Sequence, residues 1–168
     1  VYGKYFDRNG SERLQGGEAH DGWDVARGGG RIDCYFSDQD ELTVQGDYYD
    51  GEVGNEGTFY SLSPPYVSPL VESSPVSGGN VIGRWQRQIA PDSDLLLQAY
   101  VDRAEWGIPL VKETRDTVDV DFQHRFGLGE RQEIMWGLGY RWTRGAVDTA
   151  EVVTFDDEDR RDQLFSLF

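Results

Sequence analysis

Thr117-Val118-Asp119-Val120-Asp121-Phe122-Gln123-His124-Arg125-Phe126 decides the fold of this chain, because every second side chain from Val118 onward is apolar or aromatic except His124. Such alternation is the period of a β-strand with two unlike faces. Residues 132–144 repeat it, with an apolar set of Ile134, Trp136, Leu138, Tyr140 and Trp142. The glycine-bearing segment 127–130 joins the two runs, which predicts an antiparallel hairpin. Each strand has about ten residues, nearly twice the usual globular length and about what a tilted strand needs to cross a bilayer.

The composition is that of a polar, acidic chain. Hydrophobic residues make up 38% of the 168 residues, and the mean hydropathy is −0.62. No run approaches the roughly 18 apolar residues of a transmembrane helix, whereas a transmembrane barrel is compatible because its strands are only half apolar. The net charge of −15 argues against nucleic-acid binding, which requires a basic surface. Cys34 is alone, so neither a disulfide framework nor a thiolate metal cluster is expected.

Strands and connections alternate along the rest of the chain. The same period predicts strands over 1–7, 23–36, 41–50, 80–89, 94–106 and 161–168. Short turns are expected at 37–40, 90–93 and 127–130, and longer loops at 8–21, 51–79, 107–114 and 145–159. Segment 51–79 holds four of the six prolines and is expected to be a structureless functional loop or linker.

The parity of these connections suggests a fold. Outer-membrane barrels have short turns on one side and longer loops on the other, and the chain alternates in the same way. The predicted fold is therefore all-β: an antiparallel up-and-down meander of about eight long strands over residues 1–168, part of a transmembrane β-barrel. One set of side chains is expected to point outward, namely Leu95, Leu97, Val101, Val118, Val120, Phe122, Ile134, Trp136 and Leu138. The set expected to point inward is Gln98, Asp119, Asp121, Gln123 and Glu133.

Several of these strands resemble the barrel of TonB-dependent outer-membrane receptors, the family that takes up iron–siderophore complexes, cobalamin and similar scarce ligands. The resemblance is carried by Val1-Tyr2-Gly3-Lys4-Tyr5-Phe6-Asp7-Arg8, Leu42-Thr43-Val44-Gln45-Gly46-Asp47-Tyr48-Tyr49-Asp50-Gly51, Gly79-Asn80-Val81-Ile82-Gly83-Arg84-Trp85, Asp119–Phe126 and Trp136-Gly137-Leu138-Gly139-Tyr140-Arg141. Family members have a barrel of about 22 strands around a plugged lumen. The resemblance therefore implies a wall segment in the bacterial outer membrane, in contact with lipid. The family's plug domain and TonB-contacting box have no counterpart here, so we interpret the chain as an excerpt whose missing parts meet the plug and TonB.

Two groups of residues are candidates for binding a ligand such as a ferric siderophore. Phe59, Tyr60 and Tyr66 lie in segment 51–79 and offer aromatic contacts. The second group is expected to line the lumen and comprises Arg84, Gln98, Asp119 and Asp121, with Gln86, Asp102, Gln123, Glu133 and Arg141 around them. The alternative for these polar residues is that they only satisfy one another, water or the plug.

No cofactor or metal is expected. His20 lies near Glu18 and Asp21, but the spacing fits no metal-ligand pattern and indicates an ordinary loop residue. The acidic run 156–159 has the chemistry to attract a cation, although a solvated acidic loop is the simpler interpretation. His124 is expected on the apolar face as an amphipathic ring at a membrane interface.

Two other functions fit parts of the pattern. A soluble acidic β-sandwich that binds carbohydrate through exposed tryptophan and tyrosine would use the same apolar face as its core. A glycoside hydrolase on a β-sandwich would need two carboxylates, for which Asp121 and Glu133 are the best available pair. No nucleophile with an adjacent base is evident, so we expect a receptor segment without catalysis rather than an enzyme.

Overall fold

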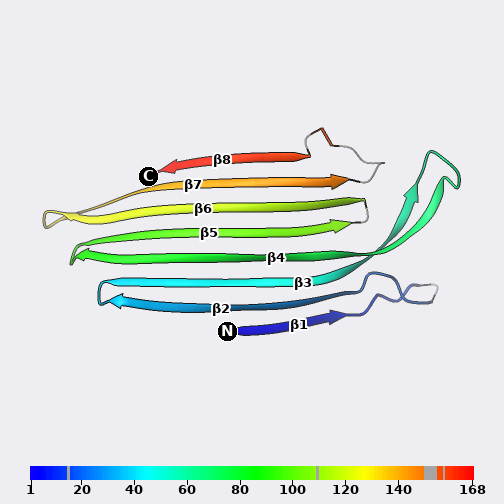
Figure 1. Cartoon of the computed structure of the whole chain (residues 1–168), viewed down its shortest axis with the longest axis horizontal. Helices are drawn as coiled ribbons and strands as arrows, with labels where there is room; N and C mark the ends of the chain where they lie inside the picture. Colours follow the sequence, from blue (N-terminus) through cyan, green and yellow to red (C-terminus); the bar gives the residue numbers. More distant parts are fainter. Residues whose placement is uncertain (15, 109, 150–154, 157) are drawn as a thin grey trace.

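Eight antiparallel strands form a single sheet in sequence order (Figure 1). The computed structural model describes residues 1–14, 16–108, 110–149, 155–156 and 158–168. Its strands are β1 (Tyr2–Arg8), β2 (Trp23–Ser37), β3 (Asp40–Tyr60), β4 (Val67–Ala90), β5 (Ser93–Ile108), β6 (Val111–Leu128), β7 (Gln132–Thr149) and β8 (Asp159–Leu167). Hydrogen bonds do not close the sheet, since β1 and β8 each pair with one neighbour only among the described residues. The predicted eight-strand meander is confirmed.

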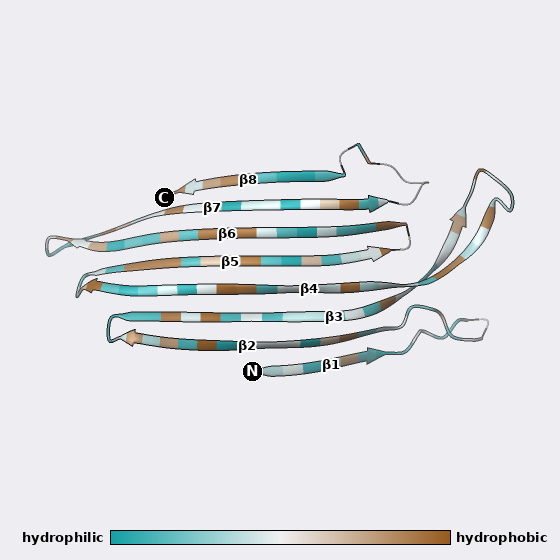
Figure 2. Ribbon diagram, in the orientation of Figure 1, coloured by the Kyte–Doolittle hydropathy of each residue, from teal (hydrophilic) through white to brown (hydrophobic). Residues whose placement is uncertain are grey.

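The register places apolar residues of neighbouring strands side by side. Leu97 on β5 lies opposite Phe122 on β6, which lies opposite Leu138 on β7. Side chains alternate along a strand, so every second residue from these belongs to the same face, here named the apolar face. It carries all the residues predicted to share it: Leu95, Leu97, Val101, Val118, Val120, Phe122, Ile134, Trp136 and Leu138. Gln98, Asp119, Asp121, Gln123 and Glu133 share the other side, the polar face. Figure 2 shows the resulting alternation of hydrophobic and hydrophilic residues along the strands.

The described residues leave the apolar face uncovered. They contain no helix and no second sheet. Val101 is 52% exposed and Leu138 is 49% exposed, and no hydrophobic side chain of the described part is buried. A contiguous apolar surface of this extent normally marks contact with a partner or a membrane. The sandwich alternative requires a second sheet, which this part of the chain does not supply.

No helix formed by the described residues is long and apolar enough to cross a membrane.

Segment 51–79 is not the structureless loop that the sequence predicted. Strands β3 and β4 continue through it, paired from Gly51↔Val76 to Tyr60↔Val67, and only residues 61–66 connect them. Beyond Val53, where the pairing of β3 with β2 ends, they form a two-stranded extension. This β3–β4 ribbon (residues 51–60 and 67–76) projects beyond the rest of the sheet and bends away from it (Figure 1). Pro69 and Pro75 fit into β4 because β5 pairs with β4 only from Ser77 onward, which leaves a free edge where a missing N–H costs no ladder bond.

The predicted loop 107–114 is also wrong. Strand β5 runs to Ile108 and β6 begins at Val111, and these two residues pair. The connections therefore do not alternate in length as predicted, although the sheet still has two unlike ends. We name them the short-turn end, where β2–β3, β4–β5 and β6–β7 connect, and the long-loop end, where the β3–β4 ribbon and residues 9–22 lie (Figure 1).

Apolar residues change faces toward the long-loop end. On β2, Ile32 and Cys34 belong to the apolar face, whereas Trp23 and Val25 belong to the polar face. The register between β2 and β3 is continuous across these positions, so no bulge causes the switch. Carboxylates take the corresponding places on the apolar face, at Asp7, Asp24 and Glu52. The apolar band is thus limited in length and ends before the β3–β4 ribbon begins.

Candidate functional site

Three of the predicted lumen residues form one row on the polar face. Arg84 of β4 lies opposite Gln98 of β5, which lies opposite Asp121 of β6. Arg84 and Gln98 line a depression of about 210 Å³ together with Thr43 and Gln45 of β3. Alternation predicted the face correctly, and the register brings the three residues together.

The two aspartates of the predicted set already have partners. Arg141 Nε donates a hydrogen bond to Asp119 Oδ2 at 2.8 Å, and the two residues are cross-strand neighbours. Gln123 Nε2 donates to Asp121 Oδ1 at 2.8 Å. The exposed Arg141–Asp119 ion pair contributes little to stability, but both contacts fix the direction of the carboxylates. For these aspartates the polar residues do satisfy one another, which leaves Arg84 and Gln98 as the groups that face an open depression.

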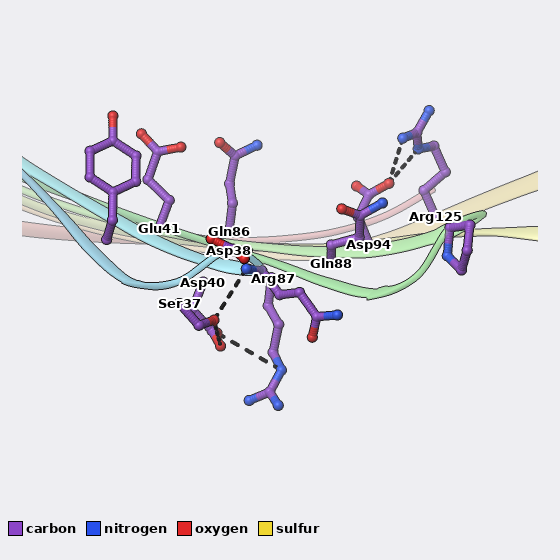
Figure 3. A pocket seen from close by; sticks show the side chains of 12 residues that line it. Ser37, Asp38, Asp40, Glu41, Gln86, Arg87, Gln88, Asp94 and Arg125 are labelled. Atoms are coloured by element: carbon purple, nitrogen blue, oxygen red, sulfur yellow. Dashed lines mark hydrogen bonds and ion pairs between the residues drawn. The ribbon is translucent and has the colours of Figure 1, made fainter.

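A larger depression of about 710 Å³ lies at the short-turn end, between the β2–β3 and β4–β5 turns. Arg125 borders it, with Nε 2.7 Å from Oδ1 of Asp94. Glu41 and Gln86, which are cross-strand partners, point to the same side of the sheet as this pair (Figure 3). The depression is broad, and most of the side chains that line it are polar or charged. Sequence reasoning missed it because its lining comes from separate turns that only the sheet brings together.

The predicted aromatic contacts lie at the tip of the β3–β4 ribbon. Tyr60 is 72% exposed and Tyr66 is 57% exposed, whereas Phe59 is half-buried. Tyr66 has a φ of 58°, a left-handed conformation that bulky residues rarely adopt, and its N–H donates to the Ser63 carbonyl at 2.9 Å. Residues 57–71 contain no charged side chain, although 28% of the whole chain is charged. The tip is therefore a neutral, aromatic projection.

The ribbon tip and the polar row do not form one site. Between Val67 and Arg84, β4 covers about 55 Å of extended strand. A small ligand cannot touch both regions at once. The ribbon tip and the polar row are two separate regions along β4.

The structure also shows a contact between the β1–β2 connection and the β3–β4 ribbon that the sequence did not reveal. Arg13 Nη2 lies 2.5 Å from Glu56 Oε1, although the two residues are 43 positions apart. Charged residues are common in both segments, so no periodicity or spacing marks this particular pair.

His124 lies on the apolar face near the short-turn end, as predicted. Trp136 Nε1 is 3.2 Å from His124 Nδ1, and Ser93 Oγ is 3.1 Å from His124 Nε2. An indole N–H only donates, so Nδ1 accepts and the neutral ring carries its hydrogen on Nε2, which donates to Ser93. Both ring nitrogens are thus satisfied on an apolar surface. Its placement at a membrane interface stays a prediction.

The residues singled out for catalysis or metal binding do not assemble into such sites. Asp121 lies opposite Gly139, whereas Glu133 is about 20 Å farther along β7, well beyond the roughly 5–10 Å of a glycosidase pair. Among the described residues, no group of three or more His, Cys, Asp and Glu side chains is placed to hold a metal ion. In the acidic run 156–159, position 157 lies outside the described residues, and Asp159 pairs with Arg144 at 2.6 Å.

Comparison of the chain with known proteins gives no significant match to a protein-family model, to a curated protein sequence or to a solved structure.

Proposed function

We propose that this chain is a wall segment of a bacterial outer-membrane receptor that takes up a scarce ligand such as a ferric siderophore, without catalysis. The observation that carries the proposal is the uncovered apolar face of the eight-strand sheet. On β7 the apolar stretch from Ile134 to Trp142 contains about nine residues, which suffices for a strand tilted by roughly 45° to cross the hydrocarbon layer. Lipid is the partner that covers such a face without a second sheet.

The boundary of the apolar band supports the same proposal. At the long-loop end of the band, the apolar face carries Arg103, Asp116 and Arg144 in one cross-strand row. Arg103 Nη1 is 3.5 Å from Asp116 Oδ1. Charged side chains on a lipid-facing surface are costly at the bilayer midplane and become tolerable near the interface. The row is therefore suited to the headgroup region.

In this proposal, the ligand meets the ribbon tip first and the polar row second. The neutral ribbon tip, with Phe59, Tyr60 and Tyr66, makes the first contact outside the membrane. The polar row that contains Arg84 and Gln98 lines the interior. The broad polar depression at the short-turn end would contact the plug domain. Other parts of the proposed receptor would make the contact with TonB.

Cys34 provides a direct test of the wall. It lies on the apolar face, opposite Leu42. In lipid vesicles that contain the full-length protein, we expect Cys34 to resist a membrane-impermeant maleimide until the protein is unfolded in detergent. The matched control is Thr43→Cys on a Cys34→Ser background, because Thr43 lies on the polar face and should react readily. Equal labelling rates would contradict a lipid-facing wall, and protection of Cys34 in plain buffer would favour the carbohydrate-binding sandwich.

The ribbon tip is tested by ligand binding to the full-length receptor. We expect Tyr60→Ala with Tyr66→Ala to weaken binding of a neutral iron(III) trihydroxamate chelate by about tenfold or more, as truncation of aromatic anchors does in other interfaces. Phe36→Ala is the control, because Phe36 is also exposed but lies near the short-turn end of β2 and lines neither depression. Unchanged affinity in the double variant would remove the tip from the capture site.

A further inference from the structure

We propose that Glu56 is a positioning residue that clamps the β1–β2 loop (described residues 9–14 and 16–22) onto the β3–β4 ribbon, so that the loop and the ribbon form one capture surface. Its Oε1 accepts a hydrogen bond from Arg13 Nη2 at 2.5 Å, and its Oε2 accepts one from the His20 backbone N–H at 3.0 Å. Arg13 and His20 lie on opposite arms of the loop, which are joined by the bridge between Glu12 and Glu18. One carboxylate therefore holds both arms.

A close backbone approach accompanies this clamp. The Gly54 N–H donates to the Gly22 carbonyl at 2.7 Å. A β-carbon at position 54 would lie 2.6 Å from the His20 carbonyl oxygen, closer than side chains normally come to backbone, whereas at Gly57 it would meet nothing within 4 Å. The loop can rest at this place on β3 because residue 54 has no side chain.

The loop has internal bonds that do not depend on the ribbon. The Asp21 carboxylate accepts hydrogen bonds from the Ser11 backbone N–H at 2.6 Å and from Ser11 Oγ at 2.5 Å. The Ala19 N–H donates to the Ser11 carbonyl at 2.7 Å. Glu56 is absent from all of these bonds, so it places the loop rather than folds it.

The charges of the loop and the ribbon oppose their contact at neutral pH. Apart from Arg13, the charged side chains of the loop and of the ribbon are acidic: Glu12, Glu18, Asp21, Glu52, Glu56 and Glu72. Like charges on two neighbouring segments repel each other. The Arg13–Glu56 pair replaces one such repulsion with an attraction at the point of contact.

Acid is expected to open the clamp. The hydrogen bond from Arg13, and then that from the His20 amide, hold the pKa of Glu56 below its ordinary value, and the charge of the His20 ring adds a smaller effect in the same direction. The facing residue on β4, Val71, is uncharged. A carboxyl with a lowered folded-state pKa stabilises the docked form above its ordinary pKa, and this contribution is lost as pH falls through the lowered value.

Spin labels can report this opening. With Leu14→Cys and Thr58→Cys on a Cys34→Ser background, we expect a narrow distance distribution at neutral pH and a broader, longer one in acid. Adding Glu56→Gln should give the broad distribution at both pH values. A narrow distribution in the Gln variant, or no change of the parent in acid, would overturn the clamp.

Amide hydrogen exchange separates placement from folding. In the full-length protein, Glu56→Ala should speed exchange of the His20 amide by about tenfold or more, as loss of a charge-assisted hydrogen bond implies. The Ala19 amide, which bonds inside the loop, should change little. Gly54→Ala should have the same effect on His20 through steric conflict, and Glu52→Gln and Gly57→Ala are the matched controls. An unchanged His20 amide would overturn the proposal, and equal acceleration of Ala19 would make Glu56 a folding residue instead.

The role of the clamp in capture rests on the proposed receptor function. Glu56→Ala, with Tyr60 and Tyr66 intact, should weaken binding of the neutral iron(III) trihydroxamate chelate by about fivefold or more, a usual size for coupling between two sites. If the parent binds the chelate and the variant binds it equally well, the single-surface proposal fails. If the parent does not bind the chelate, the receptor proposal fails, while the exchange measurement still decides whether Glu56 clamps the loop.

Discussion

The body of the sheet and the β3–β4 ribbon are both built from antiparallel strands, but their residues follow different patterns. In the body, β2 to β7 have neighbours on both sides, and apolar side chains gather on one face. In the ribbon, β4 pairs only with β3, and residues 57–71 carry no charge and no strict alternation. The two regions therefore form strands for different reasons. In the body, the different surroundings of the two faces account for the alternation of apolar and polar residues. In the ribbon, backbone hydrogen bonds between β3 and β4 suffice to form strands without such alternation.

Val120→Arg is expected to have the largest effect, and it tests whether the apolar face of the body meets lipid. Val120 lies near the middle of the apolar stretch of β6, so an arginine there should cost about 2–4 kcal/mol of unfolding free energy if the face meets lipid. Asp121→Asn, one residue along on the polar face, should cost far less. Denaturant unfolding of the full-length protein in vesicles measures both. Equal losses at the two positions would indicate a water-excluding protein core behind the apolar face.

A smaller effect is expected at Trp136, near the short-turn end of β7. Trp136→Phe removes the indole N–H that donates to His124 Nδ1 and should cost about 0.5–1.5 kcal/mol beyond the lost ring area. Trp142→Phe is the control for ring area, because Trp142 lies on the same face of β7. The same unfolding assay applies, and identical losses in the two variants would show that the His124 bond contributes nothing.

The smallest effect on the body should follow from shortening the ribbon. Replacing residues 58–69 with Asn-Gly would leave Gly57 and Leu70 as the last pair and close the hairpin with a favoured two-residue turn. We expect the unfolding free energy of the body to change by less than about 0.5 kcal/mol, as for surface changes elsewhere. Binding of the iron(III) chelate should be lost. A large loss of stability would mean that the ribbon supports the wall.

The sequence predicted the body well because its faces differ in polarity. The alternation in residues 116–126 and 132–144 set both the strands and the sharing of faces, and the structure confirms them. The extent of the strands was missed where glycine and proline are frequent. In segment 51–79 these residues indicated a loop, but the free edge of β4 accepts prolines, and a partner strand supplies the hydrogen bonds that no local pattern reveals.

The candidate site was predictable in kind but not in arrangement. Polar identity and parity placed Arg84, Gln98 and Asp121 on one face, but only the register between strands puts them in one row. The Glu56 contacts lay outside any such inference, because they depend on where residues 9–22 come to rest against β3.

The two prolines on the free edge of β4 have a consequence for how the ribbon meets other chains. An exposed strand edge is a template on which another chain can add a strand and start aggregation. Pro69 and Pro75 are both odd-numbered residues of β4, so their missing N–H groups fall on the same edge. That edge cannot offer a continuous ladder to an intruding strand. Ribbons of neighbouring molecules can therefore lie close together without pairing along this edge into one sheet.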